Sequence, residues 1–185
     1  MSHDRAAAWA LLTEHTASDS LRKHALAVEA AMRFYARRFG EDEELWGCTG
    51  LLHDFDYERW PNAPDHPTHG MDILRRQGWP EQMIRAIGGH ATYLGIPRDT
   101  LLARTLFAVD ELCGFLTACA YVKPSRRIAD VEPASVKKKL KDKAFARSVN
   151  REDIRLGVEE LGIPLDEHIA NCIAAMSEAA DALGL

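Results

Sequence analysis

Residues 50–58 read GLLHDFDYE, and this stretch decides how the rest of the chain is interpreted. Leu51 and Leu52 close an apolar run, and His53 and Asp54 follow directly. An imidazole and a carboxylate at the end of an apolar helix have two interpretations. Either they form the solvated tip of a core helix, or they bind a ligand such as a metal ion inside the protein.

The chain has a helical pattern from end to end. Apolar residues recur at spacings of three and four, whereas the alternating pattern of β-strands is scarce. Candidate N-caps such as Ser18 and Thr100, the stop signal Gly40 and a proline-rich segment at 61–67 divide this pattern into separate helices. The predicted helices cover residues 5–15, 18–39, 42–54, 67–77, 80–90, 99–121, 135–149, 151–161 and 164–183. We predict a single all-α domain, a helical bundle over residues 1–185.

The composition is that of an ordinary globular protein. Of 185 residues, 46% are hydrophobic and 28% are charged, which is enough for one sizeable core. The formal net charge of −5 argues against a general affinity for nucleic-acid polymers. Residues 1–15 lack the apolar core of a signal peptide, and no stretch reaches the roughly 20 apolar residues of a membrane helix. We therefore expect a cytoplasmic protein without a membrane or nucleic-acid partner.

Two further ligand-type residues lie on inward-facing stripes of predicted helices. His24 shares a stripe with Leu21 and Val28. Asp110, in LFAVDELCGFL, shares a stripe with apolar residues three and four positions away. A carboxylate on such a stripe is costly to bury unless it is paired or bound to a metal. Together with His53 and Asp54, these residues suit Fe, Mn, Zn, Ni or Co.

The order H…HD…D on successive helices resembles the HD superfamily of metal-dependent phosphohydrolases. The motifs here are RKHALAVE, GLLHDFDYE and LFAVDEL. The resemblance implies a helical bundle whose metal-binding core spans about residues 20–120, with C-terminal helices over 134–185 packed on it. It also implies one or two divalent metals held by His24, His53, Asp54 and Asp110, with Asp54 bridging the metals if two bind.

Many two-metal relatives add two histidines between the HD pair and the last aspartate. His69, in HPTHGMDIL, and His90, in IGGHATY, lie in the matching interval, and we expect both to be metal ligands. His66 competes with His69 for this role. His3, His15 and His168 lack such a context, and we interpret them as surface or capping residues.

The resemblance implies a hydrolase in which the metals activate water for attack on a phosphoester. The expected substrate is a small phosphoester, and a nucleotide is one candidate. Asp54 would act in catalysis through the metals, and Asp56 would orient a ligand or accept a proton. The 5′-nucleotidases of this superfamily carry a glutamate three residues after the HD aspartate, where this chain has Tyr57. The substrate of that class therefore does not carry over. Lys123 and Arg126 are candidate phosphate-binding residues, because they follow the helix of Asp110.

Two other functions stay open at this point. Some members of the superfamily with six ligands hold two irons and act as oxygenases, and both chemistries use the same ligands. A helical binding module with a purely structural metal is the second alternative. Met71, Ile73 and Leu74, or the C-terminal helix, could also supply the interface of a homodimer.

Overall fold

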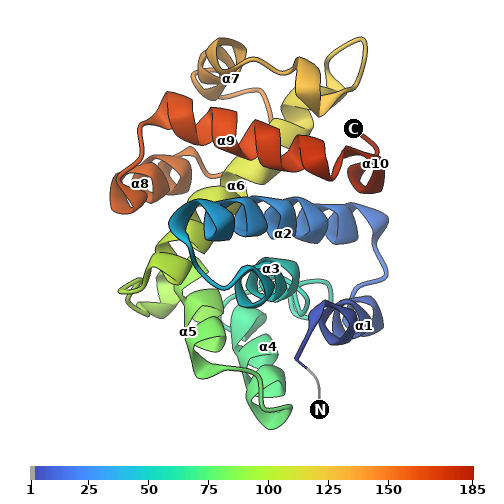
Figure 1. Cartoon of the computed structure of the whole chain (residues 1–185), viewed down its shortest axis with the longest axis vertical. Coiled ribbons are helices and arrows are strands. Elements are labelled where there is room, and N and C mark those ends of the chain that lie inside the picture. Colours follow the sequence, from blue (N-terminus) through green and yellow to red (C-terminus); the bar gives the residue numbers. More distant parts are fainter. Residues whose placement is uncertain (1–2) are drawn as a thin grey trace.

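The computed structural model describes residues 3–185 and confirms the all-α fold (Figure 1). No strand occurs within these residues. The α-helices are α1 (Arg5–His15), α2 (Asp19–Phe39), α3 (Glu43–Leu52), α4 (Asp65–Arg76), α5 (Glu81–His90), α6 (Leu101–Tyr121), α7 (Pro133–Leu140), α8 (Arg151–Leu161), α9 (Leu165–Glu178) and α10 (Ala180–Leu183). Two short 3₁₀ helices, η1 (Thr92–Leu94) and η2 (Ile128–Asp130), lie in the connections on either side of α6.

The helix boundaries follow from capping residues in the sequence. The Ser18 hydroxyl accepts a hydrogen bond from the backbone N–H of Leu21 and so starts α2, and Thr100 does the same for α6. Gly40 ends α2 with a φ of 73°, a left-handed conformation that favours glycine. These local signals explain why both long helices begin, and why α2 ends, where the sequence predicts.

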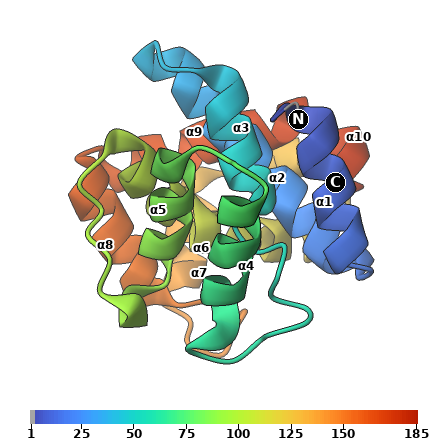
Figure 2. The same ribbon diagram turned by 90° about the horizontal axis from the view of Figure 1, so that it is seen from below.

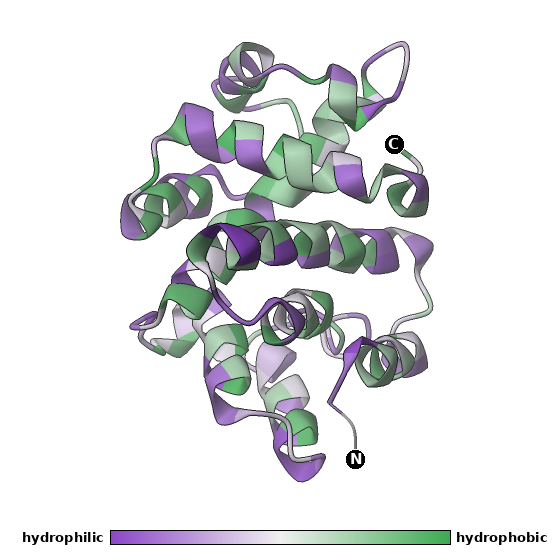
Figure 3. Ribbon diagram, in the orientation of Figure 1, coloured by the Kyte–Doolittle hydropathy of each residue, from purple (hydrophilic) through white to green (hydrophobic). Residues whose placement is uncertain are grey.

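The two 21-residue helices α2 and α6 organise the bundle. α6 runs through the molecule behind α2 in Figure 1, and it contacts α2, α5, α8 and α9. α3 packs on α2, and α4 lies beside α5, as the view from below shows (Figure 2). Hydrophilic and hydrophobic residues alternate along α2, as expected for a helix with one wet and one buried face (Figure 3).

Most buried side chains are apolar, and the buried polar side chains outside the site described below include Glu29, Thr49, Thr105 and His168. The largest completely buried side chains include Tyr35, Phe55 and Phe115. Within the described part of the chain, no helix is long and apolar enough to cross a membrane.

Helix α6 is held in place close to Asp110 by two contacts. The α carbon of Ala108 packs against Gly157 of α8, where an added Cβ would lie only 2.7 Å away. His168 of α9 donates from Nε2 to the carbonyl of Ala108 at 2.8 Å, and its Nδ1 accepts a hydrogen bond from the Tyr35 hydroxyl at 2.6 Å. The prediction of a surface or capping role is therefore wrong for His168, which is completely buried.

The sequence predicts a helix over 135–149, but α7 ends at Leu140. Residues 141–149 instead form successive turns around the guanidinium of Arg151. This group donates hydrogen bonds to the carbonyls of Asp142 at 3.2 Å and Val149 at 2.9 Å, and also to that of Phe145. A charged donor thus replaces the hydrogen bonds that a helix would make, and the turns bring Asn150 to the start of α8.

Candidate metal centre

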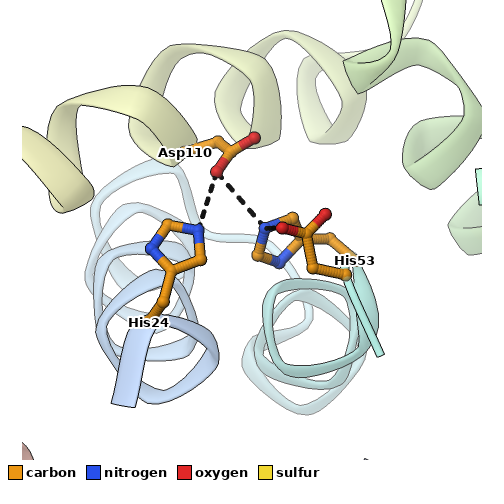
Figure 4. Close-up of side chains that lie close together, drawn as sticks. His24, His53 and Asp110 are labelled. Carbon is orange, nitrogen blue, oxygen red and sulfur yellow. Dashed lines mark hydrogen bonds and ion pairs between the residues drawn. The ribbon is translucent and has the colours of Figure 1, made fainter. Parts of the chain in front are cut away.

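Four side chains from three segments meet beside α6. His24 comes from the first turns of α2, His53 and Asp54 directly follow α3, and Asp110 lies midway along α6. The Asp110 carboxylate lies 2.9 Å from Nε2 of His24 and 3.3 Å from Nε2 of His53 (Figure 4). Nε2 of His53 also lies 3.4 Å from Asp54. The structure therefore brings together the four residues that the sequence analysis expected to hold the first metal.

A second group shares Asp54 with the first. Nε2 of His66 and Nε2 of His90 each lie 3.2 Å from Oδ1 of Asp54. His66 belongs to α4 and His90 to the end of α5. Within each of the two groups, all ligand atoms lie within 4.8 Å of one another, a spacing that could accommodate one metal ion per group. Asp54 is thus placed to bridge two such ions.

Three of the histidines are oriented through their other ring nitrogen. Nδ1 of His53 donates to the carbonyl of Gly50 at 2.7 Å, and Nδ1 of His90 donates to the carbonyl of Ile87. Nδ1 of His66 donates to Asp56 at 2.7 Å. With the proton on Nδ1, the Nε2 lone pair of each ring faces the shared carboxylates. Metal-ligating histidines are characteristically oriented in this way.

This arrangement fits a bound cation. Lone pairs of imidazole nitrogens and carboxylate oxygens repel one another unless a proton or a metal ion lies between them. Nε2 of His53 and Oδ1 of Asp54 are buried and make no hydrogen bond with any described residue. Buried polar atoms are rarely left without a partner in native proteins. The mixed nitrogen and oxygen donors suit a divalent transition metal.

In the absence of a metal ion, the histidines of the cluster bind protons, as the pKa values of the site indicate. Burial opposes charge on His53, but the carboxylates of Asp54 and Asp110 raise its pKa well above the usual value of 6.5. Burial likewise lowers the pKa of His66, but contacts with Asp54 and Asp56 outweigh it and raise the pKa to about 9. Despite burial, the charge of His53 holds the pKa of Asp54 and of Asp110 below the usual range. The cluster therefore holds positive charge against two carboxylates.

The expectation that His69 reaches this site is wrong. Its side chain is 48% exposed, stacks on Trp60 and lies 3.7 Å from Asp65. His66 takes the place instead. Its backbone is extended (ψ 136°) inside α4, as expected for a residue before proline. The His66 side chain therefore does not follow the regular helix and points toward Asp54. His69, in the first turn of the regular part of α4, faces solvent.

Asp56 lies behind His66 and outside the pocket that opens onto the site. Its carboxylate is fully buried and accepts hydrogen bonds from Nδ1 of His66 and from the backbone N–H of Gly70, both at 2.7 Å. Of the two predicted roles, this position fits the orientation of a ligand and does not fit transfer of a proton in the pocket.

A pocket of about 380 Å³ opens onto both groups. It is lined by His24, Asp54, Tyr57, His66, His90, Ala91, Thr92, Tyr93, Phe107, Asp110, Glu111, Gly114, Asn150 and Asp153. The predicted phosphate-binding residues Lys123 and Arg126 are not among them. Lys123 lies 13 positions after Asp110, so the helical rise places it about 20 Å away, near the far end of α6.

The pocket contains acidic residues that the sequence analysis missed. Glu111 follows Asp110 directly and accepts a hydrogen bond from the backbone N–H of Asn150 at 3.0 Å. Burial and the neighbouring Asp110 raise the pKa of Glu111 to about 7. Asp153 reaches the pocket from the first turn of α8. Adjacency to Asp110 was a signal for Glu111, but no sequence feature placed α8 beside the site.

Comparison with known proteins identifies the fold family. Ribonuclease Y of Desulfotalea psychrophila (strain LSv54 / DSM 12343) is 28% identical to this chain over 144 residues, which are 72% of this chain and 26% of that protein. The chain therefore spans about a quarter of the length of that relative. No solved structure matches the chain. The HD domain matches residues 21–114, which include His24, His53, Asp54 and Asp110 and make up just over half of the sequence. This chain therefore belongs to the HD domain family.

Proposed function

We propose that this protein is a metal-dependent phosphohydrolase that hydrolyses a small phosphoester, with a nucleotide as one candidate. One observation carries the proposal. The Nε2 atoms of four histidines converge on the carboxylates of Asp54 and Asp110, and Nδ1 of three of these rings is already engaged elsewhere. HD domains are in general metal-dependent phosphohydrolases. The name of the relative, Ribonuclease Y, also denotes cleavage of a phosphoester bond.

The residues divide into two candidate ligand sets. His24, His53, Asp54 and Asp110 would hold one divalent metal, and Asp54, His66 and His90 would hold a second. Bound metals would supply Lewis-acid stabilisation of phosphoryl oxygens and would lower the pKa of water. Asp56, with its hydrogen bond to His66, would keep that ring in the orientation needed for binding.

The pocket supports a small substrate. Its volume of about 380 Å³ lies at the lower end of the range of ligand pockets, which is roughly 300–1,000 Å³. Among the described residues no Lys or Arg lines it, so the candidate metals are the main positive charges available to a phosphate. The hydroxyls of Tyr57, Thr92 and Tyr93 would supply additional hydrogen bonds.

The first test is the metal content of the purified, untagged protein, measured by elemental mass spectrometry without added metal or chelator. We expect divalent metal in the wild type and its loss in Asp54→Asn, whose side chain no longer supplies the shared charge. The loaded protein should hydrolyse p-nitrophenyl phosphate or members of a panel of phosphomonoesters and nucleotides. A folded protein that binds no metal under any loading condition would disprove the proposal.

Di-iron oxygenase chemistry is the second candidate, because the two groups together supply six candidate ligands. About two irons per chain, with O₂ consumption and no phosphoester hydrolysis, would favour it. A purely structural metal predicts a different result. Asp54→Asn would then unfold the protein, whereas a folded, metal-free variant would count against that alternative.

A further inference from the structure

The pocket wall beyond the candidate ligands is acidic and aromatic. The carboxylates of Glu111, from α6, and Asp153, from the first turn of α8, both line it. Phe107 and Tyr93 supply aromatic surface to the same pocket. Of the described residues that line the pocket, only histidines can carry positive charge, and these are the candidate metal ligands.

These two carboxylates have little compensation from the protein. One oxygen of Glu111 accepts the backbone N–H of Asn150, which leaves the other oxygen free to bind a ligand. No hydrogen bond or ion pair within the described residues engages the side chain of Asp153. The guanidinium of Arg98, whose charge acts on Asp153, is already paired with Glu160 at 2.6 Å and stacks on the ring of Phe107 at 3.8 Å.

Bound metals would not supply the missing charge. Two divalent ions would be offset by the ligand carboxylates Asp54 and Asp110 and by the phosphate dianion of a substrate. The charge of Asp153, and that of Glu111 in its ionised form, would then remain unbalanced in the same pocket. A second phosphate or a carboxylate on the substrate would be repelled by these carboxylates, whereas an ammonium group would form charge-assisted hydrogen bonds with them.

We propose that the substrate carries an ammonium group, which Glu111 and Asp153 bind while the metals hold its phosphate. This inference rests on the proposed function and narrows its substrate class to aminoalkyl phosphoesters and related amino-substituted phosphoesters. It disfavours substrates with several phosphates, because no Lys or Arg among the described residues lines the pocket to bind them.

The test uses three phosphonates with the same three-carbon chain, because a C–P bond resists hydrolysis. They are 3-aminopropylphosphonate, butylphosphonate and 4-phosphonobutyrate, which end in an ammonium, a methyl and a carboxylate group. Their binding to manganese-loaded protein is measured by calorimetry, so the readout does not depend on turnover. We expect the ammonium compound to bind at least about tenfold more tightly than the methyl compound. The carboxylate compound should bind most weakly of the three.

The double variant Glu111→Gln/Asp153→Asn should bring the three dissociation constants to within about threefold of one another. Glu152→Gln is the matched control, because it removes a carboxylate from the same turn of α8 but Glu152 faces solvent and pairs with Arg155. This control should retain the preference of the wild type. Metal content is measured for each variant alongside binding.

Each outcome separates the inference from the proposed function. If all three phosphonates bind equally well to the wild type, the inference is wrong and the phosphohydrolase proposal stands. If the double variant loses a metal ion, the two carboxylates contribute to metal binding and the inference is also wrong. If the protein takes up no metal, the proposed function itself fails.

Discussion

The Asp56 carboxylate accepts a hydrogen bond from Nδ1 of His66 at 2.7 Å, from a position that is completely buried. It also accepts the backbone N–H of Gly70 at 2.7 Å, so the start of α4 and the ring of His66 are fixed by one side chain. A carboxylate in this position sets the tautomer of the ring and increases its basicity as a ligand.

Asp56→Asn should therefore weaken the second metal site. We expect the affinity for the metal held by Asp54, His66 and His90 to fall by about 10- to 100-fold, while the first site keeps its metal. Calorimetric titration of the metal-free protein with Mn²⁺ measures the affinity of both sites. Asp65→Asn is a control on the exposed start of α4 and should bind like the wild type. Equal losses at both sites would contradict this role.

His66→Ala and His69→Ala form a matched pair three residues apart. His66→Ala should lose one of two bound metals, because its Nε2 lies 3.2 Å from Asp54. His69→Ala should keep both, because the His69 ring stacks on Trp60 at the surface. Elemental mass spectrometry after metal loading and gel filtration distinguishes the two variants. Loss of metal in His69→Ala alone would restore the prediction made from the sequence.

Metal affinity should rise with pH up to about 9. His66 must lose its proton to bind a metal, and contacts with Asp54 and Asp56 raise its pKa to about 9 despite burial. Protons therefore compete with the metal over this range. Calorimetric titrations between pH 6 and 9 should show progressively tighter binding and a smaller release of protons. Affinity that does not change with pH would show that His66 is not a ligand.

The metal-free protein should show the opposite trend in stability. Protonated His53 and His66 stabilise the fold fully below their unfolded pKa of 6.5, and this contribution is lost as pH rises through the folded values. Asp54 and Asp110 have lowered pKa values, so their contribution is present above 3.8 and is lost at lower pH. Urea denaturation with chelator should therefore give the largest free energy of unfolding between about pH 4 and 6.5.

Gly157→Ala should destabilise the protein by about 2–3 kcal/mol. The new Cβ would lie 2.7 Å from the α carbon of Ala108, and backbone atoms cannot rotate away as a side-chain end could. Gly40→Ala is the control, because an added Cβ at this position meets open space. Only the positive φ of 73° would be unfavourable for alanine. It should cost about 1 kcal/mol. Denaturation of the metal-loaded protein measures both, and Gly157→Ala should also lower metal affinity by shifting Asp110.

Much of the fold and half of the candidate site follow from local sequence patterns. Ser18 and Thr100 determine where the long helices begin, and Gly40 where α2 ends, through hydrogen bonds and φ angles within a few residues. Helical periodicity places His24 and Asp110 on inward faces, because a residue's position around a helix depends only on its spacing. The pattern formed by these residues with His53 and Asp54 therefore predicted both the family and the first group of ligands.

The family resemblance also pointed to His90, which lies 3.2 Å from Asp54, but tertiary structure decided the rest of the pocket. Whether His66 or His69 turns inward depends on an extended residue before Pro67 and on Asp56, which reaches it from another segment. Lys123 and Arg126 lie away from the site because they follow the far end of α6. Asp153 lines the pocket because α8 packs across α6 at Gly157. The physical reason is that caps and periodicity are interactions between near neighbours in the chain. The composition of a pocket depends on which distant helices pack together, and no local pattern encodes that.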